Sequence, residues 1–405
     1  MIDFPSDAVC AYPVFLQSYS RIIGGKRETW TDTCNRTLRG LFEIGKFSEL
    51  EKSIIEEMQR NFYALPSGRY LWIGGTDWLK KPENFPGAFN CASTRIVDWE
   101  AFGLMMELGM MGCGTGAVLT PECIDQLPSI CNSLEVEVLD NLGEYYQQDI
   151  FVEETTIVVS SDRHCHYLLV GDSRQGWVKA YLHLLKAASC TDFESAIKVK
   201  VNLGNVRPKG TRIQGFGGVS NPSKLSQLFP KVAKILNKAV GRKLTAVECC
   251  LLIDEAALIV VAGNVRRSAG IRQFISTDED AAKVKMNLWQ QDEGGNWNID
   301  SERDALRMAN HTRVFHSKPT LEQCIESVRL QYECGEGAIQ WSGEAVARAN
   351  ADILANKVIK KSFLSLYDQD RNIAQDFLSK ISDSDLETVE HRMNRYGVNP
   401  CGEII

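Results

Sequence analysis

Three residues near the carboxyl end of the chain, Asn399, Cys401 and Glu403, combine side-chain types and a spacing that could support chemistry. Pro400 and Gly402 between them both oppose helix, so we expect an extended backbone with the three side chains on one side. That side would present an amide that holds hydroxyl groups, a thiol for redox or radical chemistry, and a carboxylate able to act as a general base. A loop with a buried structural thiol is the alternative interpretation.

Two other segments combine charged and polar side chains that could bind a nucleotide: Asn264, Arg266, Arg267 and Ser268, and, earlier in the chain, Asp172, Ser173 and Arg174. The arginine pair follows a predicted helix and could hydrogen-bond a base or phosphates. A solvated charge pair at a helix end is the alternative. The earlier segment precedes a predicted helix, where free backbone N–H groups favour either an anion or plain capping by side chains.

Three further patterns predict structure rather than chemistry. The glycines of residues 112–116 suggest a phosphate-binding loop, but they follow a predicted helix and precede a strand, the reverse of the required order, so a tight turn is expected. His164 and His166 alternate along a predicted strand and have no second ligand pair at metal-site spacing. Cys249 and Cys250 are expected to be core thiols of an apolar helix. No metal site is predicted.

The elements that must position these residues follow from hydrophobic periodicity and from Gly and Pro breakers. In chain order we expect a helical segment over 14–62, loops and short strands over 66–90, a helix over 99–111, a strand over 117–119, β-rich pieces over 150–160 and 166–171, and a helix over 175–188.

Two capping boxes mark later helices. Residues 245–248 open an apolar helix that runs to residue 262, and residues 384–387 open another that Gly397 is expected to close.

Composition and charge limit the class of protein. Apolar residues make up 44% and charged residues 24% of the 405 residues, as in an ordinary globular protein. A net charge of −7 argues against broad capture of nucleic acid. Thirteen scattered cysteines, with neither a cationic leader nor an uninterrupted apolar span, predict a cytoplasmic protein with free thiols and no membrane partner.

The residue identities in several motifs indicate a protein family more specifically than the spacing of those residues does. Residues 399–404, Asn-Pro-Cys-Gly-Glu-Ile, resemble the central finger loop of ribonucleotide reductases. Other segments resemble the monomeric, adenosylcobalamin-dependent branch of that family, and they extend along nearly the whole chain: 67–76 (SGRYLWIGGT), Asn90-Cys91, 171–177 (GDSRQGW), 216–218 (FGG) and 264–269 (NVRRSA). The sequence therefore resembles an adenosylcobalamin-dependent ribonucleoside-triphosphate reductase.

The resemblance implies roles for particular residues. Cys401 matches the cysteine that carries a thiyl radical and abstracts the ribose 3′ hydrogen, and Glu403 matches the carboxylate that takes the 3′-hydroxyl proton. Asn399 matches the amide that holds substrate hydroxyls. Cys91 matches one of two thiols that reduce the substrate and end as a disulfide, which a thioredoxin-like carrier would restore. The resemblance also implies a deoxynucleotide effector, bound near residues 172–174 and read through residues 264–268.

A fold and its boundaries also follow from the resemblance. The family has a ten-stranded α/β barrel built from two half-barrels, with the finger loop through its centre, and this sequence matches the first half. We expect an N-terminal helical lobe over 1–65, the first part of the half-barrel over 66–121, an inserted α+β effector-site subdomain over 122–200, the remainder of the half-barrel with its helices over 201–397, and the finger loop over 398–405.

The last residues, Ile404 and Ile405, read as the start of a strand, so a continuation of the chain is expected. The second reducing thiol, most adenosylcobalamin contacts and part of the substrate phosphate site would belong to that C-terminal portion. We therefore expect a chain that is inactive alone and, with the complementary portion, reduces ribonucleoside triphosphates for DNA synthesis. The short lead before the helical lobe leaves no room for an ATP-binding regulatory domain, so only specificity control is expected.

Two other functions fit the same sequence. One is a non-catalytic, nucleotide-binding remnant of such an enzyme. The other is the catalytic subunit of a ribonucleotide reductase whose radical comes from a metal-containing partner subunit.

Overall fold

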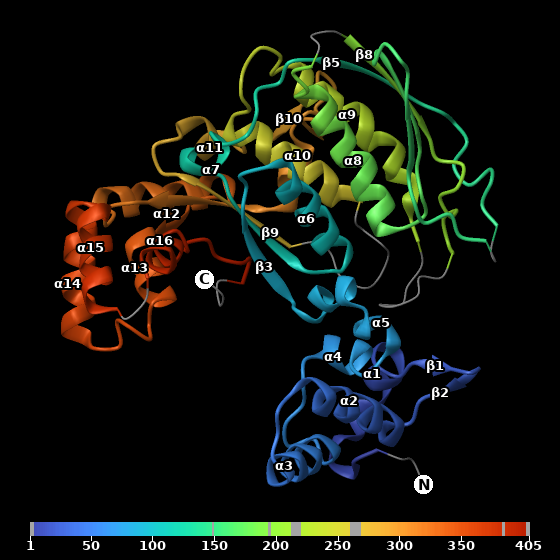
Figure 1. Cartoon of the computed structure of the whole chain (residues 1–405), viewed down its shortest axis with the longest axis vertical. Helices are drawn as coiled ribbons and strands as arrows, with labels where there is room; N and C mark the ends of the chain where they lie inside the picture. The colour runs from blue at the N-terminus through green and yellow to red at the C-terminus, as the bar shows by residue number, and fades with distance from the viewer. Residues whose placement is uncertain are drawn as a thin grey trace. The chain divides into compact units, whose positions relative to one another are not determined.

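The computed structural model describes residues 4–147, 150–192, 196–211, 220–259, 269–382 and 385–401. These residues fall into two units, whose boundary in the sequence lies between Asn90 and Cys91. Figure 1 shows the amino-terminal unit in blue and the second unit in the remaining colours.

The amino-terminal unit is largely helical, as predicted for residues 14–62. Its elements are η1 (Ser6–Ala11), α1 (Tyr12–Ser18), the short hairpin of β1 (Ile22–Ile23) and β2 (Lys26–Arg27), α2 (Trp30–Ile44), α3 (Glu49–Arg60), α4 (Gly68–Ile73), α5 (Asp77–Lys80) and η2 (Pro82–Ala88). Capping boxes at Thr29 and Ser48 begin α2 and α3. Phe15 and Trp30 lie in the core of this unit.

The prediction of loops and short strands over residues 66–90 is wrong, because this segment forms α4, α5 and η2. The buried guanidinium of Arg36, on α2, donates to the backbone oxygens of Leu71 at 2.9 Å and Gly74 at 2.5 Å. These hydrogen bonds satisfy carbonyl groups at the end of α4 that lack partners within the helix. The segment therefore belongs to the helical unit, and the second unit begins at Cys91.

Five parallel strands form the main sheet of the second unit: β3 (Cys91–Arg95), β4 (Gly114–Val118), β9 (Gly270–Ile275), β12 (Asn310–Phe315) and β13 (Ala338–Trp341), in the spatial order β13-β12-β9-β4-β3. All four neighbouring pairs are parallel. Parallel strands need long crossovers, and here α6 (Trp99–Met110) leads from β3 to β4, while α12 (Leu321–Cys334) leads from β12 to β13. The helix α10 (Ala246–Ile259) precedes β9. This is the architecture expected for one half of a ten-stranded barrel.

The pairing register defines one face of this sheet, which we call the inner face. Paired residues of neighbouring parallel strands, and every second residue along a strand, point to the same side. Cys91 pairs with Gly114 and Val118 pairs with Gln273. The residues that share this side include Cys91, Ser93, Gly114, Gly116, Val118, Gln273 and Thr312.

A second sheet lies in the chain between β4 and β9. Its strands β5 (Ser133–Val138), β8 (Ala196–Asn202), β7 (Cys165–Leu169) and β6 (Thr156–Val159) follow one another in that spatial order, and only the β6–β7 pair is antiparallel. The helices α8 (Arg174–Ala188) and α9 (Leu225–Asn237) pack against β5. The strands β6 and β7 and the helix α8 lie where strands and a helix were predicted, whereas β5, β8 and α9 were not predicted. The α+β character of the insertion is confirmed.

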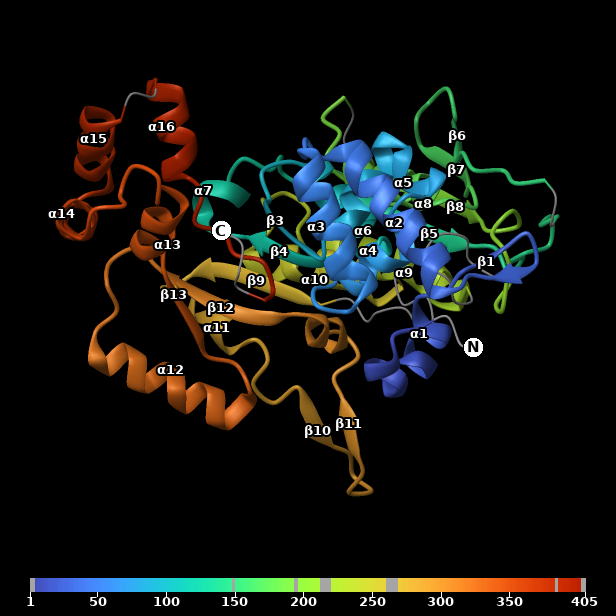
Figure 2. The same ribbon diagram turned by 90° about the horizontal axis from the view of Figure 1, so that it is seen from below.

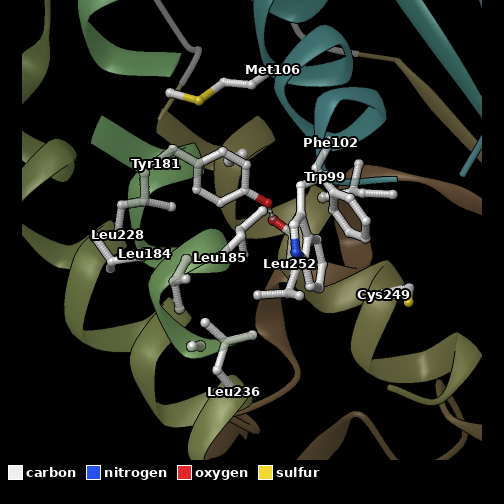
Figure 3. Close-up of a cluster of buried hydrophobic side chains, with 14 of the residues drawn as sticks. Trp99, Phe102, Met106, Tyr181, Leu184, Leu185, Leu228, Leu236, Cys249 and Leu252 are labelled. Carbon is white, nitrogen blue, oxygen red and sulfur yellow. Dashed lines mark hydrogen bonds between the residues drawn. The ribbon is translucent and has the colours of Figure 1, made fainter. Parts of the chain in front are cut away.

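This second sheet and the half-barrel share one hydrophobic core. Figure 3 shows Trp99 and Phe102 of α6 close to Tyr181 and Leu184 of α8 and to Leu252 of α10. The Tyr181 hydroxyl donates to the backbone oxygen of Leu252 at 3.1 Å, which satisfies the polar end of a fully buried side chain. The inserted region is therefore an integral layer of the second unit.

The thiols of Cys249 and Cys250 lie in this layer, as predicted. Both side chains are fully buried on α10, and burial raises the pKa of each thiol above its ordinary value. A neutral, buried thiol acts as a small apolar side chain, so these two cysteines serve packing.

His166 and His183 form a hydrogen-bonded pair between β7 and α8. The Nε2 atom of His183 lies 2.8 Å from the Nδ1 atom of His166. Burial, together with the nearby His166 and Lys186, lowers the pKa of His183 to about 4. His166 thus has its partner inside the fold.

We expect the stability of the second unit to fall as the pH drops from 6.5 to about 4. In this window the unfolded chain takes up a proton at His183, whereas the folded chain does not, so unfolding is favoured by acid. The full effect of a pKa lowered from 6.5 to about 4 is on the order of 3 kcal/mol. Urea unfolding at several pH values should show a flatter profile for His183→Gln and an unchanged one for the control His391→Gln, on the exposed side of a C-terminal helix. Equal slopes in all three proteins contradict this prediction.

Four helices follow β13: α13 (Ser342–Ala349), α14 (Lys357–Gln369), α15 (Arg371–Ile381) and α16 (Leu386–Met393). Asp385 caps α16 by accepting from the backbone N–H of Thr388, while Ser384, predicted for this role, lies outside the described residues. The prediction that Gly397 closes this helix is wrong, because α16 ends at Met393. The chain leaves the helix early because Tyr396 is fully buried in the core under it.

The remaining elements are short: α7 (Pro121–Ile124), η3 (Pro222–Lys224), α11 (Glu279–Lys283), the hairpin of β10 (Trp289–Gln291) and β11 (Trp297–Ile299), and η4 (Asp304–Met308). None of the helices in the described part of the chain is long and apolar enough to cross a membrane.

Candidate active site

The last described residues, 397–401, lie along the inner face of the half-barrel. Figures 1 and 2 show this segment, in red, beside β3, β4 and β9. Gly397 lies against Ser93 and Val118, and further along the segment Pro400 lies against Gly114. The segment therefore runs from the carboxyl ends of the strands toward their amino ends, as a finger loop inside a barrel must.

Glycines on β4 make room for this segment. A Cβ atom at Gly116 would lie 2.2 Å from the backbone oxygen of Val398. One at Gly114 would lie 3.0 Å from the Sγ atom of Cys91 and 3.2 Å from a ring carbon of Pro400. The predicted tight turn over residues 112–116 is thus present only at its start, where Gly112 has a φ of 72°. Glycine within a strand is typical of a close backbone approach, and that approach is the role of Gly116.

The two cysteines that the sequence singles out meet at the amino end of the sheet. Cys91 is the first residue of β3 and is buried, while Cys401 is exposed. Their Sγ atoms lie 3.7 Å apart, and neither residue is in a disulfide. A small movement would bring the two sulfur atoms to the bonding distance of a disulfide, about 2 Å. The arrangement can therefore carry thiol redox chemistry.

Of the stretch 399–403, for which an extended backbone is expected, the structure describes residues 399–401. Pro400 and Cys401 form a turn, which suits the fixed φ of proline. Asn399 is fully buried and Cys401 is exposed, so these two side chains do not share one environment. Glu403 lies outside the described residues.

Tyr396 anchors the segment at its beginning. Its hydroxyl lies 2.8 Å from the Oγ1 atom of Thr120 and donates to the carboxylate of Glu122. Burial and the hydrogen bond to Glu122 raise the pKa of Tyr396 above its ordinary value. Burial alone would raise the pKa of Glu122, but this hydrogen bond and the nearby His316 and Arg371 outweigh it and lower that pKa. At neutral pH the tyrosine is therefore the donor and the carboxylate the acceptor.

We expect Tyr396→Phe to lower the free energy of unfolding by about 1–3 kcal/mol, because the buried partners of the hydroxyl lose a hydrogen bond. Urea unfolding at neutral pH measures this loss. Tyr332→Phe is the matched control, since the Tyr332 side chain is 93% exposed. Equal stability of Tyr396→Phe and the wild-type chain contradicts the anchoring role.

The predicted nucleotide-binding segments have different outcomes. Asn264, Arg266, Arg267 and Ser268 lie outside the described residues. Ser173 caps α8, since its Oγ atom accepts from Gly176 N at 2.9 Å. Asp172 is buried and accepts from the guanidinium of Arg207 at 2.9 Å, a partner that the sequence did not indicate. Arg174 lies 4.0 Å from the carboxylate of Glu107. Of these three residues Ser173 caps the helix, and a bound effector stays a prediction.

Comparison with known proteins bears on the fold of the chain. A family model named B12-dependent ribonucleotide reductase, insertion domain, matches residues 139–236, which is shifted toward the carboxyl end from the predicted 122–200. A crystal structure of B12-dependent (class II) ribonucleotide reductase aligns with a TM-score of 0.60 at 21% identity, over 79% of this chain and 47% of that one. This chain therefore has the fold of part of that structure.

Curated proteins with a named activity show which kind of ribonucleotide reductase the chain resembles. The adenosylcobalamin-dependent ribonucleoside-triphosphate reductase of Lactobacillus gasseri is 27% identical over 322 residues, which cover 68% of this chain and 43% of that protein. The corresponding enzyme of Lactobacillus leichmannii is 28% identical over 308 residues, or 65% of this chain and 41% of that protein. The resemblance to adenosylcobalamin-dependent ribonucleoside-triphosphate reductases is confirmed, and the chain spans less than half the length of these relatives.

The described residues fit such a cofactor in one respect. Cys401 is exposed on the inner face, so a large group can reach its sulfur atom. The described part of the chain has no group of three or more His, Cys, Asp or Glu residues placed to hold a bare metal ion. A metal that arrives inside an organic cofactor needs no such group, and the protein then contributes binding and orientation.

Proposed function

We propose that this chain supplies the thiol-bearing half-barrel of an adenosylcobalamin-dependent ribonucleoside-triphosphate reductase, which converts ribonucleoside triphosphates to 2′-deoxyribonucleoside triphosphates. The observation that carries the proposal is the approach of two cysteines that form no disulfide, Cys91 and Cys401, with Sγ atoms 3.7 Å apart on the inner face of a parallel half-barrel. The names of the relatives support the reaction and the cofactor. The complementary C-terminal portion is the partner that the reaction requires.

In the proposed mechanism Cys401 acts as a thiyl radical, removes the 3′ hydrogen atom of the ribose and returns a hydrogen atom to the same carbon at the end of the turnover, which regenerates the thiyl. Glu403 takes the proton of the 3′-hydroxyl, and the 2′-hydroxyl leaves as water. Asn399 holds the substrate hydroxyls. Cys91 and a second thiol from the complementary portion each give up a hydrogen and are left as a disulfide, which a thioredoxin-like dithiol reduces by exchange. Adenosylcobalamin, when bound, supplies the one-electron chemistry that starts the sequence.

The arrangement of the thiols suits these roles. Cys91 is buried and lies under the segment, so its thiol is shielded from bulk solvent while Cys401 is open to the inner face. Both thiols react with the same bound sugar, so they must lie close to each other.

We also propose that a deoxynucleotide controls substrate specificity through residues 264–268 and 172–174. The match to the insertion-domain model supports this proposal.

The test is an activity assay on the completed enzyme, meaning this chain co-expressed with the complementary C-terminal portion. We expect dCTP formation from CTP that requires adenosylcobalamin and a dithiol, and no product from this chain alone. Product that forms without cobalamin but with a metal-containing radical subunit would favour the other class of reductase. No product under any condition, with the two portions assembled, would favour the non-catalytic remnant.

A further inference from the structure

The segment 396–401 lies on the inner face and pairs with no strand. A buried side chain, that of Gln273, forms backbone hydrogen bonds that a neighbouring strand would otherwise form. In the described structure it is not part of any β-ladder. The backbone N–H of Val398 donates to the Oε1 atom of Gln273 at 2.7 Å. The Nε2 atom of Gln273 donates back to the backbone oxygen of Val398 at 3.0 Å. One amide group therefore satisfies both backbone groups of a single residue.

Gln273 is well placed to hold the segment firmly. It lies on β9, the central strand of the five, and its side chain is fully buried. A second glutamine, Gln340 of β13, donates to the backbone oxygen of Tyr396, two residues earlier. Buried polar groups need partners, so loss of either glutamine amide would leave a backbone group of the segment unsatisfied.

The paired hydrogen bonds select one register of the segment. In an extended backbone the N–H and C=O of one residue point to the same side, and those of its neighbours point to the other. Only residues 396, 398 and 400 could therefore face Gln273. Pro400 has no N–H to donate. The backbone oxygen of Tyr396 is already held by Gln340. Only Val398 can therefore both donate to and accept from the Gln273 amide group.

A change of register would move the reactive sulfur atom away from its partner. Each residue of extended chain spans about 3.3 Å, so a shift by two residues would displace Cys401 by roughly 7 Å. The present distance between the Sγ atoms of Cys91 and Cys401 is 3.7 Å. The glycines of β4 permit the close approach of the segment.

We propose that Gln273 is a positioning residue that sets the register of segment 396–401 and so holds the Cys401 sulfur atom beside Cys91. It acts through its two hydrogen bonds to the backbone of Val398. Its importance for catalysis rests on the proposed function, whereas its effect on the two thiols does not. The two can therefore be tested separately.

The experiment uses the chain as it exists and two variants, one that removes one of the two hydrogen bonds and one that removes both. Gln273→Glu keeps an acceptor for the Val398 N–H but loses the donor, and Gln273→Met loses both while it keeps a similar volume. Gln369→Glu and Gln369→Met, on the exposed end of α14, are the matched controls. The first readout is the equilibrium constant for the Cys91–Cys401 disulfide against reduced and oxidised glutathione, with the bond mapped by mass spectrometry. The second is hydrogen exchange at the Val398 amide.

We expect the disulfide equilibrium constant to fall by about tenfold in Gln273→Glu and by about a hundredfold in Gln273→Met, the scale of one and two hydrogen bonds to buried groups. Exchange at the Val398 amide should rise most in Gln273→Met, and both controls should match the wild-type chain. Folded variants with unchanged equilibrium constants and unchanged exchange would overturn the proposal. If Gln273→Met does not fold, Gln273→Glu decides by the same two readouts.

A parallel measurement separates this proposal from the proposed function. In the completed enzyme we expect Gln273→Glu to lower kcat with little change in KM, because the substrate still binds while the sulfur atom is misplaced. If the completed wild-type enzyme makes no deoxynucleotide but the thiol equilibrium still depends on Gln273, the proposed function fails and the positioning role stands. If the enzyme is active and kcat, the thiol equilibrium and amide exchange are all indifferent to Gln273, the positioning role fails.

Discussion

Cys401→Ser in the completed enzyme is expected to abolish deoxynucleotide formation, a loss of at least about 10⁴-fold, as for other groups that carry the bond-breaking step. Serine has nearly the same shape, so the half-barrel should keep its stability. A hydroxyl cannot replace the thiol, because its O–H bond is much stronger than the S–H bond and does not yield an oxygen radical under the same conditions. The measurement is dCTP formation with adenosylcobalamin and a dithiol.

The matched control for this experiment is Cys165→Ser. Cys165 is an exposed thiol on β7, in the inserted sheet. Its replacement should leave turnover unchanged. Turnover that is retained in Cys401→Ser, or lost equally in both variants, would contradict the radical role of Cys401.

Gly116→Ala is expected to lower the activity of the completed enzyme by about a hundredfold or more. The added Cβ atom would lie 2.2 Å from the backbone oxygen of Val398, far inside van der Waals contact, so the segment that carries Cys401 must move away from β4. A displacement of 1 Å at a reacting group can cost about a hundredfold in rate. Overpacking should also cost about 1–3 kcal/mol of stability.

The control is a second glycine-to-alanine change, at Gly294 in the exposed turn between β10 and β11. There the nearest atoms to an added Cβ are the ends of the Asn296 and Asp292 side chains, which can move aside. Activity assays and thermal unfolding of both variants give the comparison. If Gly116→Ala is as active as Gly294→Ala, the segment does not depend on the gap in β4.

Elements with strong local signals could be predicted from the sequence. The helix α8 and the capping of α10 follow from hydrophobic periodicity and from side chains within a few residues of each other, and Thr245 and Glu248 exchange the hydrogen bonds of a capping box. The parallel half-barrel was predicted from the resemblance of motifs and not from periodicity. Its five strands alternate with helices as that resemblance requires.

Contacts between distant parts of the chain could not be predicted. Gln273 and Val398 are 125 residues apart, and Tyr396 and Glu122 are 274 apart, so no local pattern links them. Gly114 and Gly116 gave a signal, since two glycines inside a strand indicate a close approach of another backbone. We interpreted them as a turn because what approaches lies near the other end of the sequence.

The helical form of residues 66–90 has a similar cause. Proline and glycine in this segment indicated loops, but Arg36 binds the carbonyl groups at the end of α4 and stabilises a helix there. That guanidinium comes from another helix, 35 residues earlier in the sequence than Leu71. Tertiary hydrogen bonding thus overrode local composition.

The most direct test of the central claim is whether one small reagent bridges the two sulfur atoms in solution. A trivalent arsenical such as phenylarsine oxide forms two As–S bonds only with thiols that are close neighbours. With Cys91 and Cys401 held 3.7 Å apart, we predict one arsenic bound across this pair, located by mass spectrometry and lost in both Cys91→Ser and Cys401→Ser. Arsenic found only on other cysteines, or undiminished in either variant, would contradict the account.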